Sequence, residues 1–216
     1  MTDSKAANLT IDVVSDVVCP WCYVGKRNLE AALALRPDLK VDVRYRPFQL
    51  DATLPPEGMD RTQYMVRKFG SLDRLKDAHQ RLEDMGNERN IHFDFAAIKR
   101  SPNTLDAHRI IRWAASVGKQ PEVKERLMSL YFEHGADVGD RTVLLDVAEA
   151  HGLDREKTAQ MLDDGTDLIA VQTEIEQAQA MGVSGVPFFI LDGKYGVSGA
   201  QPVEAMLSAI DQAAAE

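Results

Sequence analysis

The order of local sequence patterns predicts an α/β fold that is interrupted by a large, all-helical insertion. Three observations support this prediction. Strand-like and helix-like patterns alternate near both ends of the 216-residue chain, helical patterns fill its middle, and two cysteines stand where the first strand pattern gives way to the first helix pattern. We therefore expect the two ends to fold together as one α/β unit.

The first part of the chain contains two predicted strands and one predicted helix. The run from Leu9 to Ser15 predicts a strand, and residues 22–35 have a helical pattern that ends before Pro37. Residues 41–46 alternate between apolar and polar side chains, as a half-exposed strand does. A turn-rich linker at residues 54–58 then separates this part from the middle of the chain.

The middle of the chain, from Asp60 to about Met181, shows a series of helical patterns. Breaks at glycine residues separate these patterns, and apolar residues recur at helical spacing between the breaks. The stretch Ser101-Pro102-Asn103 predicts a helix start with Asn103 as the N-cap residue. We therefore expect this part to be a series of helices separated by breaks.

Strand patterns return near the C-terminus. Residues 186–191 predict a buried strand, Asp192-Gly193 predicts a tight hairpin turn, and residues 194–197 predict the partner strand. Pro202 then opens a last helix, in which the apolar side chains fall on one face.

The complete order of elements is that of a thioredoxin fold with a large inserted all-helical domain. It runs strand, helix, strand, a helical block, and then strand, hairpin, strand and helix. We expect residues 1–55 and 183–216 to form the thioredoxin-like domain, and residues 56–182 to form the inserted helical domain.

The two cysteines of the chain lie in the motif Cys19-Pro20-Trp21-Cys22, after a predicted strand and at the start of a predicted helix. A helix N-terminus offers free N–H groups and the positive end of its dipole, both of which favour a thiolate. The spacing of three brings both sulfurs onto one helix face, close enough to bridge. Pro20 suits the first turn, where its missing N–H would have no partner. The motif predicts a redox-active dithiol.

Composition excludes several other classes of function. The formal net charge of −9 argues against a nucleic-acid partner, and no apolar stretch reaches the roughly 20 residues that a membrane span needs. The first eight residues lack the basic start and apolar run of a signal peptide, so we expect a cytoplasmic protein. A structural disulfide is not expected in that reducing compartment, and such a short loop would gain little stability from one.

Five motifs spread over nearly the whole chain are similar to those of one known family. They are Cys19-Pro20-Trp21-Cys22-Tyr23, Pro47-Phe48-Gln49-Leu50, residues 101–109, Ser184-Gly185-Val186-Pro187-Phe188-Phe189 and Val197-Ser198-Gly199-Ala200-Gln201-Pro202. With these motifs the chain resembles the DsbA superfamily, and most closely its cytoplasmic FrnE-like branch. That branch also includes the glutathione-dependent 2-hydroxychromene-2-carboxylate isomerases and the kappa-class glutathione transferases, which usually carry Ser where Cys19 stands.

The motif and the resemblance together imply a thiol–disulfide oxidoreductase or isomerase. Cys19, placed at the helix end where its sulfur is least shielded, is the expected nucleophile, and Cys22 is the expected resolving thiol. Trp21 brings no positive charge, unlike the His at the matching position of the strongly oxidising periplasmic members. We therefore expect a less oxidising disulfide here, with Trp21 on the surface beside the thiol.

The resemblance also implies a cis peptide bond at Pro187, which would face the cysteines and count as part of the catalytic centre. Asp16, three residues before Cys19, is expected to cap the turn. A lone histidine such as His108 is more often structural, yet this one lies in a motif of the family. The candidate contacts for a substrate or glutathione are Pro20, Trp21, Val186, Asn103 and His108.

Three alternatives to disulfide chemistry remain. The first is a glutathione-dependent isomerase or transferase that acts on a small molecule. The second is a metal-binding module, although no second Cys/His pair completes a zinc site, so we expect no metal. The third is a scaffold whose helical block binds unfolded chains.

The expected partners follow from the dithiol. They are protein or small-molecule thiols and disulfides, with glutathione as a co-substrate and no tightly bound cofactor. The sequence leaves open whether the helical block forms a homodimer.

Overall fold

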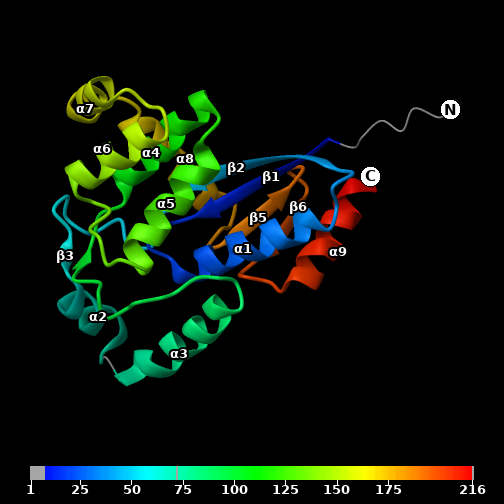
Figure 1. The fold of residues 1–216 in the computed structure, drawn as a ribbon, viewed down its shortest axis with the longest axis horizontal. Coiled ribbons are helices and arrows are strands. Elements are labelled where there is room, and N and C mark those ends of the chain that lie inside the picture. The colour runs from blue at the N-terminus through cyan, green and yellow to red at the C-terminus, as the bar shows by residue number, and fades with distance from the viewer. Residues whose placement is uncertain (1–7, 72, 216) are drawn as a thin grey trace.

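The computed structural model describes residues 8–71 and 73–215, which form a central sheet flanked by helices (Figure 1). The sheet has the strand order β2-β1-β5-β6. Its strands are β1 (Asn8–Ser15), β2 (Lys40–Pro47), β5 (Phe188–Leu191) and β6 (Tyr195–Ser198). β1 pairs with β2 in parallel and with β5 antiparallel, and β5 pairs antiparallel with β6. The two ends of the chain thus share one sheet, as the sequence predicts.

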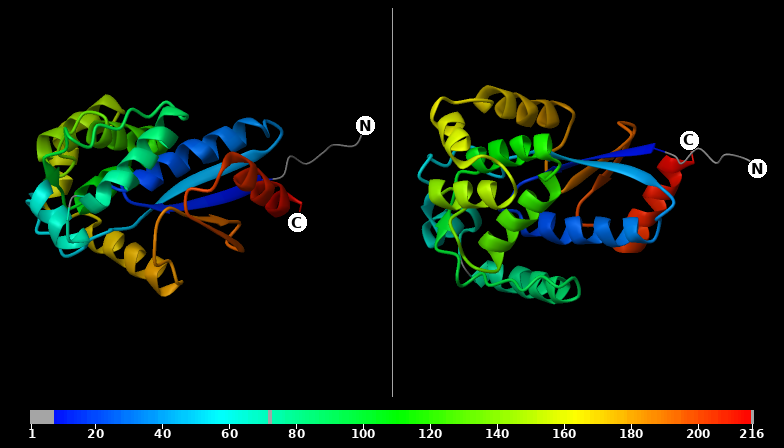
Figure 2. Two further views of the ribbon diagram at one scale, coloured as in Figure 1. Left: turned by 90° about the horizontal axis from the view of Figure 1, so that it is seen from below. Right: turned by 45° about the horizontal axis from the view of Figure 1, so that its top comes forward.

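Helices cover both faces of this sheet. α1 (Pro20–Ala34) and α9 (Val203–Ala214) pack against each other on one face, and α8 (Leu168–Ala180) lies on the other (Figure 2). The alternation of side chains along β1 explains the two layers, because Val13 belongs to the cluster that contains α1 and Val14 belongs to the cluster that contains α8.

The middle of the chain is mainly helical, as predicted, but residues 88–99 are not helical and one short ribbon is present. Its further helices are α2 (Arg61–Phe69), α3 (Asp73–Asn87), α4 (Leu105–Ala114), α5 (Gln120–Phe132), α6 (Arg141–Ala150) and α7 (Arg155–Asp163), with a 3-10 turn at Ala115–Val117. The ribbon pairs β3 (Met59–Asp60) with β4 (Arg100–Ser101). Two-residue strands carry no periodic signal, so the sequence could not predict this pairing. None of the helices in the described ranges is long and apolar enough to cross a bilayer.

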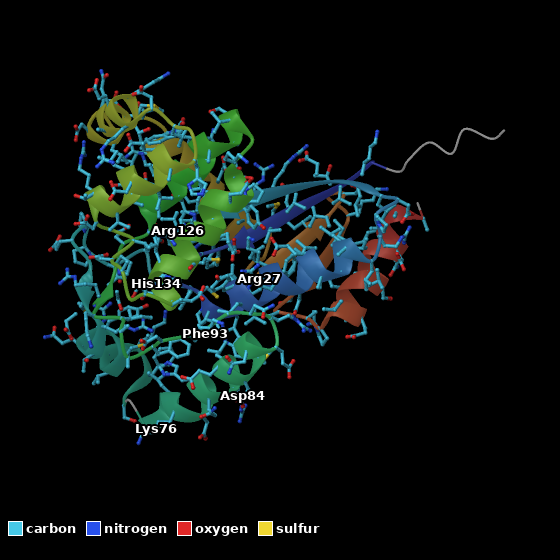
Figure 3. All side chains as sticks on the ribbon, viewed as in Figure 1. Arg27, Lys76, Asp84, Phe93, Arg126 and His134 are labelled. Atoms are coloured by element: carbon cyan, nitrogen blue, oxygen red, sulfur yellow. The ribbon has the colours of Figure 1, made fainter. Side chains whose placement is uncertain are left out.

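One hydrophobic core joins the sheet to the inserted helices. Ile11 of β1, Leu29 of α1 and Leu127 of α5 belong to the same buried cluster. Phe93 lies between α1 and α3 (Figure 3), where its ring centroid is 5.5 Å from that of Phe132. The division into two domains therefore stays a prediction, although the helical insertion itself is clear.

Several boundaries differ from the sequence-based expectations, and three of these differences lie near the cysteines or the start of α4. The strand expected from residue 186 begins only at Phe188, because Pro187 has no N–H to donate to the ladder. α1 begins at Pro20 rather than at residue 22. Asn103 is not the N-cap of α4, a position that Thr104 takes, but its Oδ1 atom still accepts a hydrogen bond from the N–H of Leu105 at 3.0 Å. The expected Asp192-Gly193 turn is present, with positive φ at both residues.

Candidate active site at the Cys19–Cys22 pair

Both cysteines lie at the N-terminus of α1 as free thiols. Cys19 is the N-cap residue, and its Sγ atom accepts a hydrogen bond from the N–H of Cys22 at 3.3 Å. The two cysteines approach to 3.1 Å of each other. Pro20 occupies the first turn of the helix, where the sequence placed it. This geometry allows a disulfide to form across one helical turn.

The two thiols differ less in exposure than the sequence suggests. Cys19 is 3 % exposed and Cys22 is 1 % exposed. The larger difference is in their surroundings, since Cys19 lines a cavity and Cys22 does not. Access to Cys19 therefore runs through that cavity.

The Val186–Pro187 bond is cis, and this loop faces the cysteines as expected. The Sγ–H of Cys19 donates to the carbonyl oxygen of Val186 at 3.5 Å, within the wider limit that applies to sulfur. Gly25 allows this approach, because a Cβ atom at that position of α1 would lie 2.9 Å from Cγ of Pro187. Sequence reasoning missed Gly25, although a glycine inside a helical pattern is a sign of close packing.

A cavity of about 350 Å³ opens beside Cys19. Pro20, Trp21 and Val186 form one side, and Trp21 is 38 % exposed, in agreement with the expected surface position. Helices α2 and α3 close the opposite side with Tyr64, Phe69, Leu75 and Leu82. No sequence pattern indicates this second wall, because it depends on where the inserted helices pack against the rest of the chain. A larger cavity of about 980 Å³ is lined by residues of β2, α4 and the start of α5, Lys124 among them, and by neither cysteine.

Two cations reach the cavity at Cys19 from α2. Nη1 of Arg61 donates to the hydroxyl oxygen of Tyr131 at 3.1 Å, and Nζ of Lys68 donates to the hydroxyl oxygen of Tyr64 at 2.9 Å. Burial raises the pKa of Tyr131 to about 12, so its hydroxyl stays neutral at physiological pH. The cavity therefore combines an apolar wall with two positive charges, which suits a ligand that has both apolar and anionic parts.

A buried polar network lies behind the cysteines. Oδ2 of Asp16 accepts a hydrogen bond from the N–H of Leu50 at 2.8 Å. Nε2 of His108 lies 2.9 Å from the carbonyl oxygen of Phe48 and 3.3 Å from Oδ1 of Asp16. Because a carbonyl oxygen can only accept, Nε2 carries the proton and donates to both. Asp16 therefore ties down the loop after β2 with its side chain, rather than capping its own turn as expected.

The charge on Asp16 is stable in this network. Burial raises the pKa of its carboxyl. This effect is outweighed by groups that lower the pKa, namely the hydrogen bond and charge of His108, the N–H of Leu50 and the charge of Lys124. The net pKa of Asp16 lies below its ordinary value, so a buried negative charge persists behind the dithiol.

Cys22 and Lys124 form the least expected part of the site. Burial raises the pKa of the Cys22 thiol well above its ordinary value, Cys19 raises it further, and the charge of Lys124 lowers it. Burial lowers the pKa of Lys124 to about 8. Nothing in the sequence pattern of α5 distinguishes Lys124 from a surface lysine, so only the structure could identify it.

Comparison with known proteins places this site in a family. Residues 10–211 match the family described as DSBA-like thioredoxin domain. The chain belongs to this family. A probable DsbA oxidoreductase from Streptomyces coelicolor is 31 % identical in sequence, with a TM-score of 0.88 over 96 % of this chain and 91 % of that one.

Two more distant structures share the fold of this DSBA-like chain. A 2-hydroxychromene-2-carboxylate isomerase is 16 % identical, with a TM-score of 0.72 over 94 % of this chain and 95 % of that one. The cytosolic disulfide reductase DsbM from Pseudomonas aeruginosa, in a structure with glutathione, is 17 % identical, with a TM-score of 0.62 over 94 % of this chain and 98 % of that one.

The structure of this DSBA-like chain brings some of the predicted contacts to Cys19 and not others. Pro20, Trp21 and Val186 line the cavity, whereas Asn103 and His108 do not. Nδ2 of Asn103 donates to the carbonyl oxygen of Leu54 at 2.8 Å, and its Oδ1 accepts from the side chain of Gln49 at 3.0 Å. Both residues hold the loop at residues 48–54, and their part in substrate binding stays a prediction. The described ranges hold no group of three or more His, Cys, Asp or Glu residues suited to a metal ion.

Proposed function

We propose that this DSBA-like protein is a thiol–disulfide oxidoreductase that uses Cys19 as the nucleophile and Cys22 as the resolving thiol. The observation that carries the proposal is the juxtaposition of both thiols at the start of α1, with the cis-Pro187 loop against Cys19. The cavity leads a substrate to Cys19 and leaves Cys22 behind it.

The proposed reaction consists of two thiol–disulfide exchange steps. The Cys19 thiolate attacks one sulfur of a substrate disulfide, which breaks the disulfide bond and releases the first substrate thiol. Cys22 then attacks Sγ of Cys19, which closes the Cys19–Cys22 disulfide and releases the second substrate thiol. Two electrons pass from the dithiol to the substrate, and the reverse sequence oxidises a dithiol substrate instead. During either reaction the backbone of Val186 would pair with the substrate, beside Pro187.

Glutathione is the proposed co-substrate, and the cytoplasm is the proposed compartment. The positive charges of Arg61 and Lys68 would hold its carboxylates, while Trp21 would contact the rest of the molecule. The structural likeness to a cytosolic disulfide reductase that was solved with glutathione supports both proposals.

A second candidate function is that of a glutathione-dependent isomerase or transferase. The fold of the 2-hydroxychromene-2-carboxylate isomerase favours it, as does a cavity of about 350 Å³ that suits a small molecule. In this function Cys22 would be dispensable. Activity that requires glutathione and survives Cys22→Ser would therefore favour the isomerase or transferase.

A redox titration tests the main proposal. The protein is equilibrated in glutathione buffers, the thiols are alkylated, and the mass of the product gives the fraction of disulfide, with Trp21 fluorescence as a second signal. We expect one reversible two-electron transition between about −270 and −120 mV. Cys19→Ser and Cys22→Ser are the controls, and neither should show it. Capping of Cys19 by a single glutathione, with no internal disulfide, would reject the oxidoreductase.

A further inference from the structure

Lys124 is a buried amine with an unusual lack of hydrogen bonds. Its side chain is only 1 % exposed, and Nζ has no hydrogen-bond partner among the described residues. α5 is fixed to β2 one turn earlier, where Gln120 accepts from the N–H of Tyr45 at 2.9 Å and donates to its carbonyl oxygen at 3.3 Å. From this anchor Nζ of Lys124 lies over the ring of Tyr45, 5.9 Å from its centroid.

A second buried lysine shows what a structural role looks like in this protein. Nζ of Lys26 lies 2.5 Å from Oε1 of Glu30 and 2.7 Å from Oε2 of Glu125. Burial of an ammonium group is costly unless such partners compensate for the lost water. None of the carboxylates in the described part of the chain lies within ion-pair distance of Nζ of Lys124, so ion pairing does not explain the position of this lysine.

The groups that face Lys124 point to the dithiol. The hydroxyl of Tyr23, the residue after Cys22 on α1, donates to Oε1 of Glu125, the residue after Lys124 on α5, at 3.1 Å, so the two helices bring Cys22 and Lys124 into one buried region. The charge of Lys124 interacts there with Cys19, Cys22, Lys26 and Asp16. His108 on α4 lies on the other side of Asp16 and is hydrogen-bonded to it, and the ring of Tyr45 covers Lys124 from β2. Asp16 is the fixed negative charge of this set, and ionisation of Cys22 adds a second one.

We propose that Lys124 is a positioning residue for the resolving step, in which its buried ammonium group stabilises the thiolate of Cys22. The proposal rests on the proposed function and adds a group to it. Cys22 loses its proton, its thiolate attacks Sγ of Cys19, and the bond from Cys19 to the substrate sulfur breaks. The electron pair leaves with the substrate thiolate, which takes up a proton, and Lys124 keeps its own proton throughout.

The electrostatics agree with this role. Burial opposes ionisation of Cys22, and the charge of Lys124 is the largest interaction that favours it. The pKa of about 8 keeps Lys124 charged at neutral pH, where cellular thiol exchange takes place. The free-energy cost of the unpaired ammonium group in the resting protein is thus recovered in the step that creates a negative charge beside it.

The reaction with an aromatic disulfide that releases a coloured thiolate tests the proposal. The reduced protein first forms a mixed disulfide at Cys19 and releases one equivalent, and attack by Cys22 then releases the second. In Lys124→Met we expect a second phase that is about tenfold or more slower at neutral pH and recovers as the pH rises, and a first phase that changes much less, because the charge of Lys124 interacts more weakly with Cys19 than with Cys22. Lys119→Met is the matched control at the N-cap of the same helix, since Lys119 is exposed and paired with Glu122.

A thiolate titration separates the electrostatic role from a structural one. Ultraviolet absorbance follows Cys22 in a Cys19→Ser background, and the addition of Lys124→Met should raise the pKa of Cys22 by about one unit or more. The addition of Lys119→Met should leave that pKa unchanged.

The outcomes distinguish this inference from the proposed function. Release of only one equivalent by the unaltered protein would reject the oxidoreductase itself. Release of both equivalents at equal rates with and without Lys124, or an unchanged pKa of Cys22, would overturn only the role of Lys124. Failure of both Lys124→Met and Lys124→Gln to fold would also overturn it, because the lysine would then be a structural link between α5 and β2.

Discussion

Arg109 and Lys124 are both buried cations of the inserted helices, but their hydrogen bonding differs. Arg109 lies near the ends of α7 and α8, and Lys124 lies against the sheet behind the dithiol. The guanidinium group of Arg109 has an acceptor on every nitrogen, whereas Nζ of Lys124 has none among the described residues. The difference teaches that burial of a charge does not by itself indicate its role, whereas the presence or absence of partners does.

The partners of Arg109 are backbone groups that need a donor. Its Nε donates to the carbonyl oxygen of Thr166 at 2.8 Å, and its other nitrogens reach the carbonyl oxygens of Met161 and Leu162. The last carbonyl groups of a helix have no partner inside that helix, so Arg109 satisfies the C-terminal end of α7. The charge of Arg109 therefore stabilises the folded protein, whereas the charge of Lys124 destabilises it.

The largest effect is expected for Arg109→Met. Removal of the buried guanidinium group takes the side-chain donor away from the carbonyl oxygens of Leu162 and Thr166, and we expect a loss of about 3–5 kcal/mol in the free energy of unfolding. Urea unfolding measures this loss, and the rates of thiol exchange in the folded variant should stay the same. A loss below about 1 kcal/mol would mean that Arg109 is not the structural member of the comparison.

Lys124→Met should have the opposite sign. We expect an increase of about 1–3 kcal/mol in the free energy of unfolding at neutral pH, because methionine removes the uncompensated charge and fills its space. A decrease at neutral pH would contradict the comparison, since it would show that Lys124 is stabilised by contacts in the folded protein.

The pH dependence of that difference has a defined sign. The folded pKa of Lys124 is about 8 and the ordinary value is 10.5, so between these values the unfolded chain binds a proton that the folded protein does not. Stability of the unaltered protein therefore rises relative to Lys124→Met as the pH rises through this window, and the full penalty is present below pH 8. Urea unfolding of both proteins across the window measures the change, and a difference that stays constant would refute the assignment.

Asp16→Asn tests the negative charge that faces Lys124. We expect a loss of about 2 kcal/mol at neutral pH, because the amide weakens the contact with His108 and removes the charge opposite Lys124. The folded pKa of Asp16 lies below 3.8, so its contribution is present above that pH and is lost as the pH falls through the folded pKa. The cost of the substitution should therefore shrink in acid, and acid unfolding curves of both proteins would reveal a cost that does not.

The smallest effect is expected for Asp106→Asn. Nη1 of Arg109 donates to Oδ1 of Asp106 at 2.8 Å, but the carboxylate is about half exposed and the pair is screened by water. We expect a loss below about 1 kcal/mol in urea unfolding, since the backbone carbonyl groups still hold Arg109. A loss as large as that of Arg109→Met would assign the stabilisation to the ion pair instead.

The sequence by itself determined the order of elements and the centre of the chemistry. These features depend on residues that are close together in the sequence, so they can be recognised without the structure. They are the apolar runs of β1 and β5, the alternation along β2 and the spacing of Cys19 and Cys22. Resemblance to a family supplied the cis bond at Pro187, which no local pattern indicates.

Only the tertiary structure decided what surrounds the dithiol. The second wall of the cavity comes from α2 and α3, and Lys124 comes from α5, more than one hundred residues after Cys22. In the tertiary structure, Asn103 and His108 form hydrogen bonds with the loop at residues 48–54 and do not line the cavity. The physical reason is that burial, partners and charge depend on contacts between distant segments, whereas residue pattern and spacing report only on neighbours along the chain.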